Sequence, residues 1–308
     1  MKAAKVRFLE KGETPVVPKG MKILPKGVQK KYIEKRKPYR VEPGEILIAI
    51  LQVTAEKGMT SPWRKNARTM LEQLKKDGVT VIIPPITGEL PWDILPMAKG
   101  KELMRFFAFA GAKEALRRMG KQPEESRFLL AGGDAEVWWS ILLSMGTDVN
   151  HLSILTDAKK EAEVLGQELF EEYGLLTEVF ASPKNPLFAQ ADVVFGCGLE
   201  QRNYSHILKE GAIFIDLAGN HPVLRKLQES RPDVTVIDGF FFRRGEKQME
   251  GREAEAEAFL SCPVFRENWS FSPEYSVGKE ILCELEEKGY AVSGFSIGEK
   301  RVKIRKNP

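Results

Sequence analysis

The stretch from residue 127 to residue 237 alternates short apolar runs with helix-like segments, and this alternation constrains the fold more than any other feature. Runs of a few β-branched, aromatic and leucine residues predict strands, whereas apolar residues spaced three or four apart predict helices. The predicted strands are Arg127–Ala131, Leu152–Leu155, Leu176–Phe180, Val193–Phe195, Ile213–Asp216 and Val234–Ile237. The predicted helices are Ala135–Ser144, Ala158–Tyr173, Tyr204–Lys209 and Val223–Glu229. Strands alternating with helices indicate an α/β fold with a doubly wound parallel sheet.

The N-terminal part predicts a smaller α/β domain. Residues 1–43, rich in proline and lysine, predict an extended and irregular lead-in. The continuous apolar run Ile46–Leu51 is typical of a buried parallel strand. A helix over Trp63–Lys76 and a strand over Val79–Ile83 complete a β-α-β unit.

A helix over 100–119 and a polar break over 120–125 follow this unit, and the break is our predicted domain boundary. After residue 250 the pattern becomes helical, and we expect a C-terminal helix that crosses back to the first domain, followed by a basic tail. The predicted domains are an N-terminal α/β substrate-side domain over 1–120, a Rossmann-like domain over 121–250 and a C-terminal segment over 251–308.

Composition excludes several classes of protein. The 308 residues contain no apolar run of about 18 residues, which a membrane-spanning helix needs, and the first residues lack the apolar core of a secretory signal. Three widely spaced cysteines and three scattered histidines argue against a disulfide framework and a metal site. We therefore expect a cytoplasmic protein without a metal.

Basic residues are concentrated near the N-terminus, although the net charge is only +4. Residues 19–40 carry nine lysines and arginines against one acid, Glu34. Such a stretch can contact the phosphates of nucleic acids or anionic lipids. We interpret it as a solvated arm and do not expect a nucleic-acid partner; the minor alternative is a protein that binds nucleic acid or an anionic surface through residues 19–40.

A glycine-containing turn lies between the predicted strand Arg127–Ala131 and the next helix. Ala131, Gly132 and Gly133 stand where dinucleotide-binding sheets place backbone N–H groups against a diphosphate, so we predict cofactor contacts there. The G-x-G-x-x-G pattern is degenerate. Asp134 occupies its second glycine position if Gly132 is the first glycine, and Leu130 occupies its first glycine position if Gly132 is the second. Carboxylates at Asp134 and Glu136 would compete with a phosphate. The alternative is an empty loop with another use.

Two further turns follow predicted strands. Asp157 lies 25 residues after Gly132, where an acid can bind ribose hydroxyls and favour NAD over NADP; Asp157 could equally cap the next helix. Gly196, Cys197 and Gly198 offer small side chains where a nicotinamide or ribose would lie. We predict cofactor contacts at these four residues.

The helix sequence FAFAGAKEALRRMG, the turn AGGDAEVW and the later ADVVFGCG and GAIFIDLAGN together resemble the NAD(P)-binding domain of the shikimate dehydrogenase and glutamyl-tRNA reductase superfamily. The resemblance implies a Rossmann fold and NAD or NADP as cofactor. Residues 60–65 are similar to the lysine motif of shikimate dehydrogenases, which makes Lys65 a catalytic candidate. Ala108 occupies the position of their catalytic aspartate, which argues against shikimate chemistry.

Residues 231–262 resemble a group of predicted amino-acid dehydrogenases and acyl-carrier-protein reductases. This resemblance implies that Cys262 accepts an acyl group as a nucleophile; an inert cysteine is the alternative. His221, in a loop after a predicted strand, is our candidate for a general acid–base.

These observations predict an NAD(P)-linked oxidoreductase that acts on a small carbonyl, acyl or amino-acid-like substrate in the interdomain cleft. The alternative is a non-catalytic protein that binds a ligand or partner on a degenerate dehydrogenase scaffold. Both a monomer and a homo-oligomer are compatible with the sequence.

Overall fold

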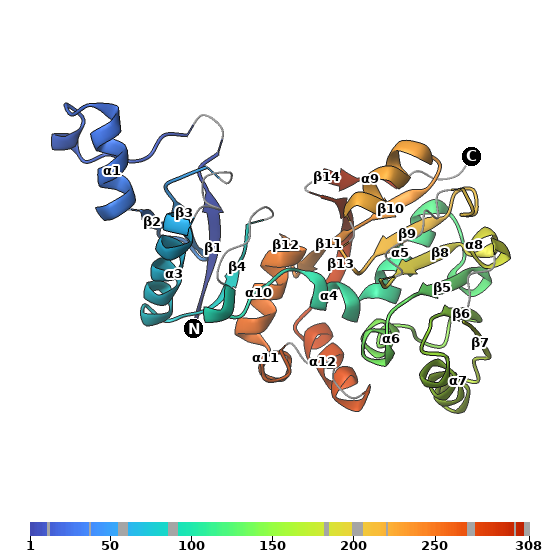
Figure 1. Ribbon diagram of the computed structural model, residues 1–308. Helices are drawn as coiled ribbons and strands as arrows, with labels where there is room; N and C mark the ends of the chain where they lie inside the picture. The colour runs from blue at the N-terminus through green and yellow to red at the C-terminus, as the bar shows by residue number, and fades with distance from the viewer. Residues whose placement is uncertain are drawn as a thin grey trace. The chain divides into compact units, whose positions relative to one another are not determined.

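The computed structural model describes residues 1–10, 13–36, 38–54, 61–85, 92–181, 185–198, 206–219, 221–269, 275–298 and 300–304 (Figure 1). The chain divides into two compact units. Unit 1 contains Met1–Lys99 and Glu255–Arg266, and unit 2 contains Gly100–Ala254 and Glu267–Pro308. The domain limits predicted at residues 120 and 250 stay predictions.

Unit 1 is built on a four-stranded sheet in the order β2-β3-β1-β4. The strands are β1 (Lys2–Phe8), β2 (Tyr39–Glu42), β3 (Leu47–Leu51) and β4 (Val79–Ile83). β1 is parallel to both β3 and β4, and β2 is antiparallel to β3. The strands expected near Ile46–Leu51 and at Val79–Ile83 are therefore confirmed.

The expectation of an irregular lead-in over residues 1–43 is wrong, because β1 is a central strand of this sheet. Its buried residues Ala4, Val6 and Phe8 alternate with Lys5 and Arg7, which are only partly buried. Long basic side chains can keep their charged ends in water while their stems pack. Such residues therefore fit into this strand, although they make its sequence look like an irregular segment. The same region holds β2 and two helices, η1 (Lys19–Met21) and α1 (Lys26–Arg36).

Helix α3 (Ser61–Lys76) packs on this sheet and confirms the predicted helix. Its apolar residues share a core with residues of β1, β3 and β4; the contributing α3 side chains are Trp63, Ala67, Met70, Leu71 and Leu74. The other helices among the described residues of this part are η2 (Trp92–Ile94), α10 (Gly251–Ser261) and α11 (Pro263–Glu267). Both α10 and α11 cross the unit boundary.

Unit 2 contains a parallel six-stranded sheet in the order β10-β9-β8-β5-β6-β7. Its strands are β5 (Arg127–Ala131), β6 (His151–Leu155), β7 (Thr177–Phe180), β8 (Val193–Gly196), β9 (Ile213–Asp216) and β10 (Thr235–Ile237). Counted along the chain, this is the 3-2-1-4-5-6 order of doubly wound dinucleotide-binding sheets. The predicted α/β fold class is confirmed, and the strand order reverses between β5 and β8.

The helices of unit 2 are α4 (Lys101–Phe106), α5 (Ala108–Met119), η3 (Pro123–Glu125), α6 (Ala135–Leu142), α7 (Lys159–Tyr173), α8 (Asn185–Gln190), α9 (His221–Ser230) and α12 (Tyr275–Glu287). The single helix predicted over 100–119 is interrupted at Phe107, whose ring packs edge-on against Phe242. The helix predicted over Tyr204–Lys209 lies partly outside the described residues, and residues 206–209 form a turn and a bend instead. α12 packs on α6, where Gly278 faces Leu143.

A small antiparallel sheet completes unit 2 in the order β12-β11-β13-β14. Its strands are β11 (Gly239–Arg244), β12 (Lys247–Glu250), β13 (Tyr290–Ile297) and β14 (Lys300–Val302). Gly111 of α5 fits against the ring of Phe240, where a β-carbon would come within 2.4 Å. Among the described residues, no helix is long and apolar enough to cross a membrane.

Candidate functional site

The glycine turn after β5 lies where the strand order of the large sheet reverses. The Gly132 N–H donates to the Leu155 carbonyl at the end of β6, and the Cys197 N–H donates to the Ala131 carbonyl from the end of β8. Gly132 and Gly133 have φ values of 89° and 83°, which residues with a side chain rarely adopt. Open α/β sheets bind their ligands at this edge, outside the carboxyl ends of the strands.

Both carbonyl groups of the turn are engaged by the protein. The buried indole of Trp138 donates to the Gly132 carbonyl at 2.8 Å, and the Thr156 hydroxyl donates to the Gly133 carbonyl at 3.3 Å. In a trans peptide the C=O and the following N–H point in opposite directions. The N–H groups of Gly133 and Asp134 are therefore directed away from Trp138 and Thr156, beside the N-terminus of α6.

The same helix end carries two carboxylates. Asp134 accepts a hydrogen bond from the Val137 N–H at 3.0 Å and is the N-cap of α6, and both Asp134 and Glu136 are exposed. A carboxylate at this place stabilises the helix but repels a phosphate. The geometry thus provides backbone donors for an anion together with a charge that weakens its binding.

The end of β6 presents Asp157 to solvent. The alternative that Asp157 caps α7 is wrong, because the N-cap is Ala158, whose N–H donates to the Thr156 hydroxyl at 3.0 Å. Among the described residues, no hydrogen bond or ion pair involves Asp157. Its carboxylate can therefore accept hydrogen bonds from a ligand such as a ribose.

The end of β8 is closely packed. A β-carbon on Gly196 would lie 2.8 Å from the Phe214 ring, and one on Gly133 would lie 3.1 Å from the Cys197 β-carbon. Burial raises the pKa of the Cys197 thiol to about 12, although the nearby charge of Arg105 opposes this rise. Cys197 is thus a neutral thiol under Gly133, next to Gly198.

The end of β9 holds a buried acid with one unused oxygen. Asp216 is 2% exposed, and its Oδ1 accepts from the N–H groups of Ala218 and Gly219, both at 3.1 Å. Its Oδ2 is buried without a hydrogen-bond partner among the described residues. Leaving such an atom unsatisfied costs about 1–3 kcal/mol, so it indicates a ligand or water position.

Two cations from α4 lie at this edge. Lys101 Nζ donates to the carbonyls of Asp216 at 3.1 Å and Asp238 at 3.3 Å, which ties α4 to the ends of β9 and β10. The Arg105 guanidinium forms an ion pair with Glu102 at 3.5 Å, but its buried Nε has no hydrogen-bond partner within the described chain. Asp216 and Arg105 both influence the Cys197 thiol electrostatically, which places them in one neighbourhood.

Sequence reasoning missed both Arg105 and Asp216 as site residues. Asp216 ends an apolar strand, at the edge where ligands bind, and that position was an available signal. Arg105 follows Lys101 by one helical turn, which puts both on one face of a short helix. The sequence does not reveal that α4 lies against this edge.

Two of the three predicted catalytic residues belong to unit 1 and the third belongs to unit 2. Lys65 is exposed on α3, and Cys262 is fully buried after α10, with its Sγ 3.8 Å from the Ser261 hydroxyl oxygen; both belong to unit 1. His221 begins α9 in unit 2, and its side chain lies outside the described residues. Their catalytic roles stay predictions.

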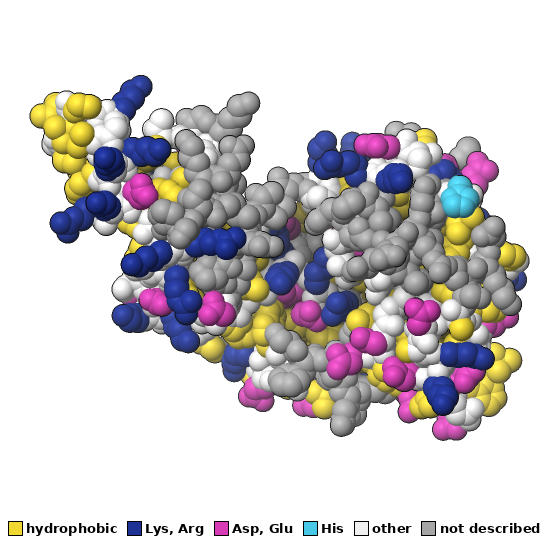
Figure 2. Space-filling model, in the orientation of Figure 1, with side chains coloured by type: hydrophobic (Ala, Val, Ile, Leu, Met, Phe, Trp, Pro, Cys, Tyr) yellow, Lys and Arg dark blue, Asp and Glu magenta, His cyan; other side chains and the backbone are white. Residues whose placement is uncertain are grey.

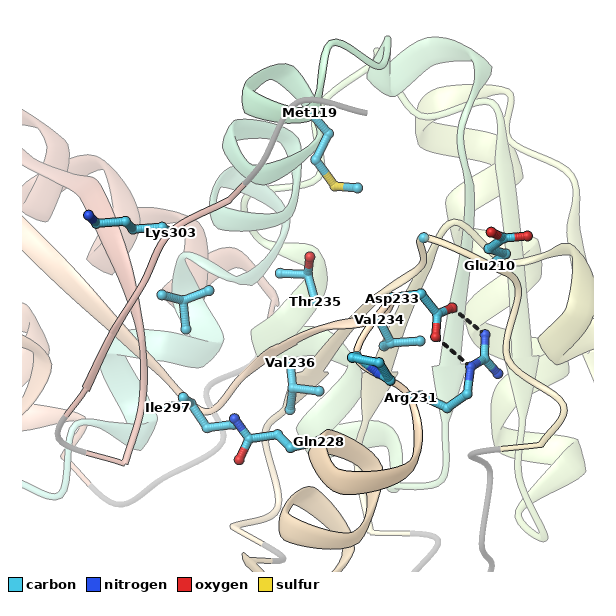
Figure 3. A pocket seen from close by; sticks show the side chains of 13 residues that line it. Met119, Glu210, Gln228, Arg231, Asp233, Val234, Thr235, Val236, Ile297 and Lys303 are labelled. Atoms are coloured by element: carbon cyan, nitrogen blue, oxygen red, sulfur yellow. Dashed lines mark hydrogen bonds and ion pairs between the residues drawn. The ribbon is translucent and has the colours of Figure 1, made fainter. Parts of the chain in front are cut away.

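A separate pocket of about 870 Å³ lies at the opposite edge of the large sheet (Figure 3). It opens beside Gly211 and Thr235, at the amino ends of β9 and β10, and Arg231 pairs with both oxygens of Asp233 on its wall. The loops that bind ligands in such sheets lie at the other edge. Within the described residues, no group of three or more His, Cys, Asp or Glu side chains could hold a metal.

No family model matches the chain, and no curated protein does. Solved structures similar to it include a shikimate dehydrogenase in complex with NADP+, with 12% identity over 92% of this chain and 95% of that one and a TM-score of 0.34. An L-tryptophan dehydrogenase from Nostoc punctiforme has 11% identity over 93% and 80% of the two chains and a TM-score of 0.39. A shikimate dehydrogenase from Aquifex aeolicus has 13% identity over 91% and 97% and a TM-score of 0.36. Because the sequence identities and TM-scores are this low, the fold assignment rests on the strand order of the large sheet and not on the similarity to these structures.

Proposed function

We propose that the protein is an NAD(P)-linked oxidoreductase that acts on a small carbonyl, acyl or amino-acid-like substrate. The observation that carries the proposal is the glycine turn at the reversal of the strand order. Its carbonyls are held inward by Trp138 and Thr156, so the Gly133 and Asp134 N–H groups are presented at the N-terminus of α6. Backbone donors at a helix N-terminus suit the diphosphate of a dinucleotide.

The polar groups on either side of the turn fit the two halves of such a cofactor. On the β6 side, the exposed Asp157 carboxylate suits ribose hydroxyls. On the β9 side, the unused Asp216 Oδ2 is an acceptor and the unused Arg105 Nε is a donor. A carboxamide has one N–H₂ donor and one carbonyl acceptor, so these buried atoms suit the nicotinamide amide. A bound nicotinamide would supply or accept a hydride.

The residues of this chain would position the substrate beside that end of the site. The positive charges of Lys101 and Arg105 can stabilise a negative charge on a carbonyl oxygen or hold a carboxylate. Lys101 is fixed by the carbonyls of Asp216 and Asp238, so its charge is preorganised. His221, Lys65 and Cys262 remain the candidates for proton transfer and for a covalent acyl step.

Titration of the protein with NADH and with NADPH, followed by nicotinamide fluorescence, tests the proposal. We expect micromolar binding of at least one of them, and the comparison decides between the two cofactors. The Asp134→Asn variant should bind the dinucleotide about fivefold more tightly. Asparagine still caps α6, whereas the repulsion of about 1 kcal/mol between the carboxylate and the phosphates is removed. Glu168→Gln, which neutralises an exposed carboxylate on α7, is the matched control and should leave binding unchanged.

Failure of both the unaltered protein and Asp134→Asn to bind either dinucleotide at millimolar concentration would overturn the proposal. The glycine turn would then serve another ligand or a partner on a dehydrogenase-like scaffold.

A further inference from the structure

Helix α1 and the turn before it form a strongly basic surface of unit 1. Seven cationic side chains between residues 19 and 36 are exposed, and no ion pair or hydrogen bond of their charged groups occurs within the described chain; they are Lys19, Lys22, Lys26, Lys30, Lys31, Lys35 and Arg36. One acid, Glu34, accompanies them in this segment. Seven unpaired cations repel one another, so a surface of opposite charge would stabilise this helix.

Apolar side chains are exposed on the same segment. Ile23 is 88% exposed just before α1, and Val28 in its first turn is 46% exposed. Val16 and Val41, which flank the segment, are also among the exposed large hydrophobic side chains. Figure 2 shows hydrophobic and basic side chains together around α1, at the upper left. Exposed aliphatic residues beside unpaired lysines mark an interaction site more specifically than either feature alone.

The attachment of α1 to unit 1 fixes which side of the helix faces outward. Ile33 is buried in the unit 1 core, and the Asn66 side chain donates to the Glu34 carbonyl at 3.0 Å. Val28, Lys31 and Lys35 are three and four residues apart, so they share one face of the helix. This face is rotated by more than a quarter turn from Ile33 and is open to solvent.

We propose that α1 and the preceding turn dock on an anionic lipid surface, with Ile23 and Val28 inserted among the acyl chains and the lysines against the headgroups. Surface segments bind anionic membranes through a combination of apolar burial and attraction between basic side chains and the headgroups; here the turn before α1 supplies Ile23 and α1 supplies Val28 and most of the lysines. A nucleic acid that is bound through its phosphates would use the lysines, but its charged backbone offers no apolar surface to Ile23. The two partners therefore differ in whether Ile23 contributes.

Co-sedimentation of the full chain with vesicles tests the proposal. We expect binding to phosphatidylcholine vesicles that contain about one third phosphatidylglycerol, little binding to pure phosphatidylcholine, and a decrease with added salt. The double variant Lys31→Ala, Lys35→Ala should bind about 25-fold more weakly, at about fivefold for each lysine. Ile23→Ser, which keeps every charge, should weaken binding about tenfold.

Leu176→Ser is the matched control for Ile23→Ser, because Leu176 is 76% exposed in unit 2, outside the basic segment; its vesicle binding should equal that of the unaltered chain. All four positions are exposed, so unchanged circular dichroism is expected. Equal vesicle binding by Ile23→Ser and the unaltered chain would overturn the proposal. Binding of a nucleic-acid duplex in place of vesicles, unaffected by Ile23→Ser, would overturn it in favour of a nucleic-acid surface.

Discussion

The indole Nε1 of Trp138 donates a hydrogen bond to the carbonyl oxygen of Gly132 at 2.8 Å, entirely inside the protein. This bond sets the orientation of the peptide between Gly132 and Gly133, and so the direction of the Gly133 N–H. A core side chain thereby determines which backbone donors the candidate site presents. The turn is consequently sensitive to a substitution that leaves its own sequence unchanged.

Trp138→Phe should destabilise unit 2 by about 1–3 kcal/mol, because it leaves the Gly132 carbonyl without a donor and opens a small cavity. It should also weaken dinucleotide binding. Thermal unfolding and the NADH titration measure the two effects. Trp139→Phe, at the adjacent half-buried position, should have the smaller effect on both. Unchanged stability of Trp138→Phe would contradict the role of the indole in holding the turn.

Gly133→Ala should cost more than the same substitution at another glycine with positive φ. At φ +83°, alanine costs about 1 kcal/mol, and its β-carbon would lie 3.1 Å from both the Cys197 β-carbon and Trp138 Nε1. Gly174→Ala has a φ of +69° with nothing within 4 Å, so it isolates the backbone cost. A lower melting temperature for Gly133→Ala than for Gly174→Ala is expected, and equal values would show that the close approach to Cys197 is relaxed at no cost.

The large sheet could be predicted because its strands are short, apolar and separated by helices of regular spacing. Arg127–Ala131 and Ile213–Asp216 were predicted with the limits that the structure has. β1 could not be predicted, because Lys2, Lys5 and Arg7 interrupt its apolar pattern. The stems of Lys5 and Arg7 pack only once β3 and β4 lie on either side. β11 follows β10 after the single residue Asp238, without a helix between them, so the strand–helix alternation gave no signal for it.

The candidate site could be predicted only where the residue type itself indicates the backbone conformation. Gly132 and Gly133 report a turn with positive φ, and glycine is the residue that allows it. Asp216 and Arg105 can be recognised as site residues only from the polar atoms that lack a partner after folding, and these atoms are determined by packing. For Asp157 the sequence left two interpretations, a helix cap and an exposed acid. The choice between them depends on the residue at which α7 begins.

The three cysteines should differ sharply in reactivity. Cys283 is exposed, whereas Cys197 and Cys262 are buried, and burial raises the pKa of Cys197 to about 12. At pH 8 only about one in ten thousand Cys197 thiols would be ionised, and the thiolate is the reactive form. Iodoacetamide followed by mass spectrometry should label Cys283 alone in the native protein and all three after denaturation. Native labelling of Cys262 would instead support its role as an acyl acceptor.

Asp192 should make the stability of unit 2 depend on pH. It is buried before β8, and its Oδ1 accepts from Lys209 at 2.8 Å and Lys121 at 3.1 Å, while Oδ2 accepts from the Arg127 N–H at 3.2 Å. Burial alone would raise the pKa of Asp192, but these three bonds together outweigh burial and lower the pKa from its ordinary value of 3.8. A lowered pKa means that the folded state favours the ionised carboxylate.

Asp192→Asn should therefore destabilise the protein by about 2 kcal/mol at pH 7, since it leaves two lysines facing a neutral amide. The stabilisation by the carboxylate is fully present above pH 3.8 and is lost as pH falls through the lower pKa of the folded state. Melting temperatures of the two proteins measured from pH 7 downward should accordingly converge below about pH 4. Glu163→Gln removes an exposed ion pair with Lys159 and should change the melting temperature little at any pH. The difference in melting temperature between Asp192→Asn and the unaltered protein could instead stay undiminished below about pH 4. That result would show that the lysines do not hold Asp192 ionised.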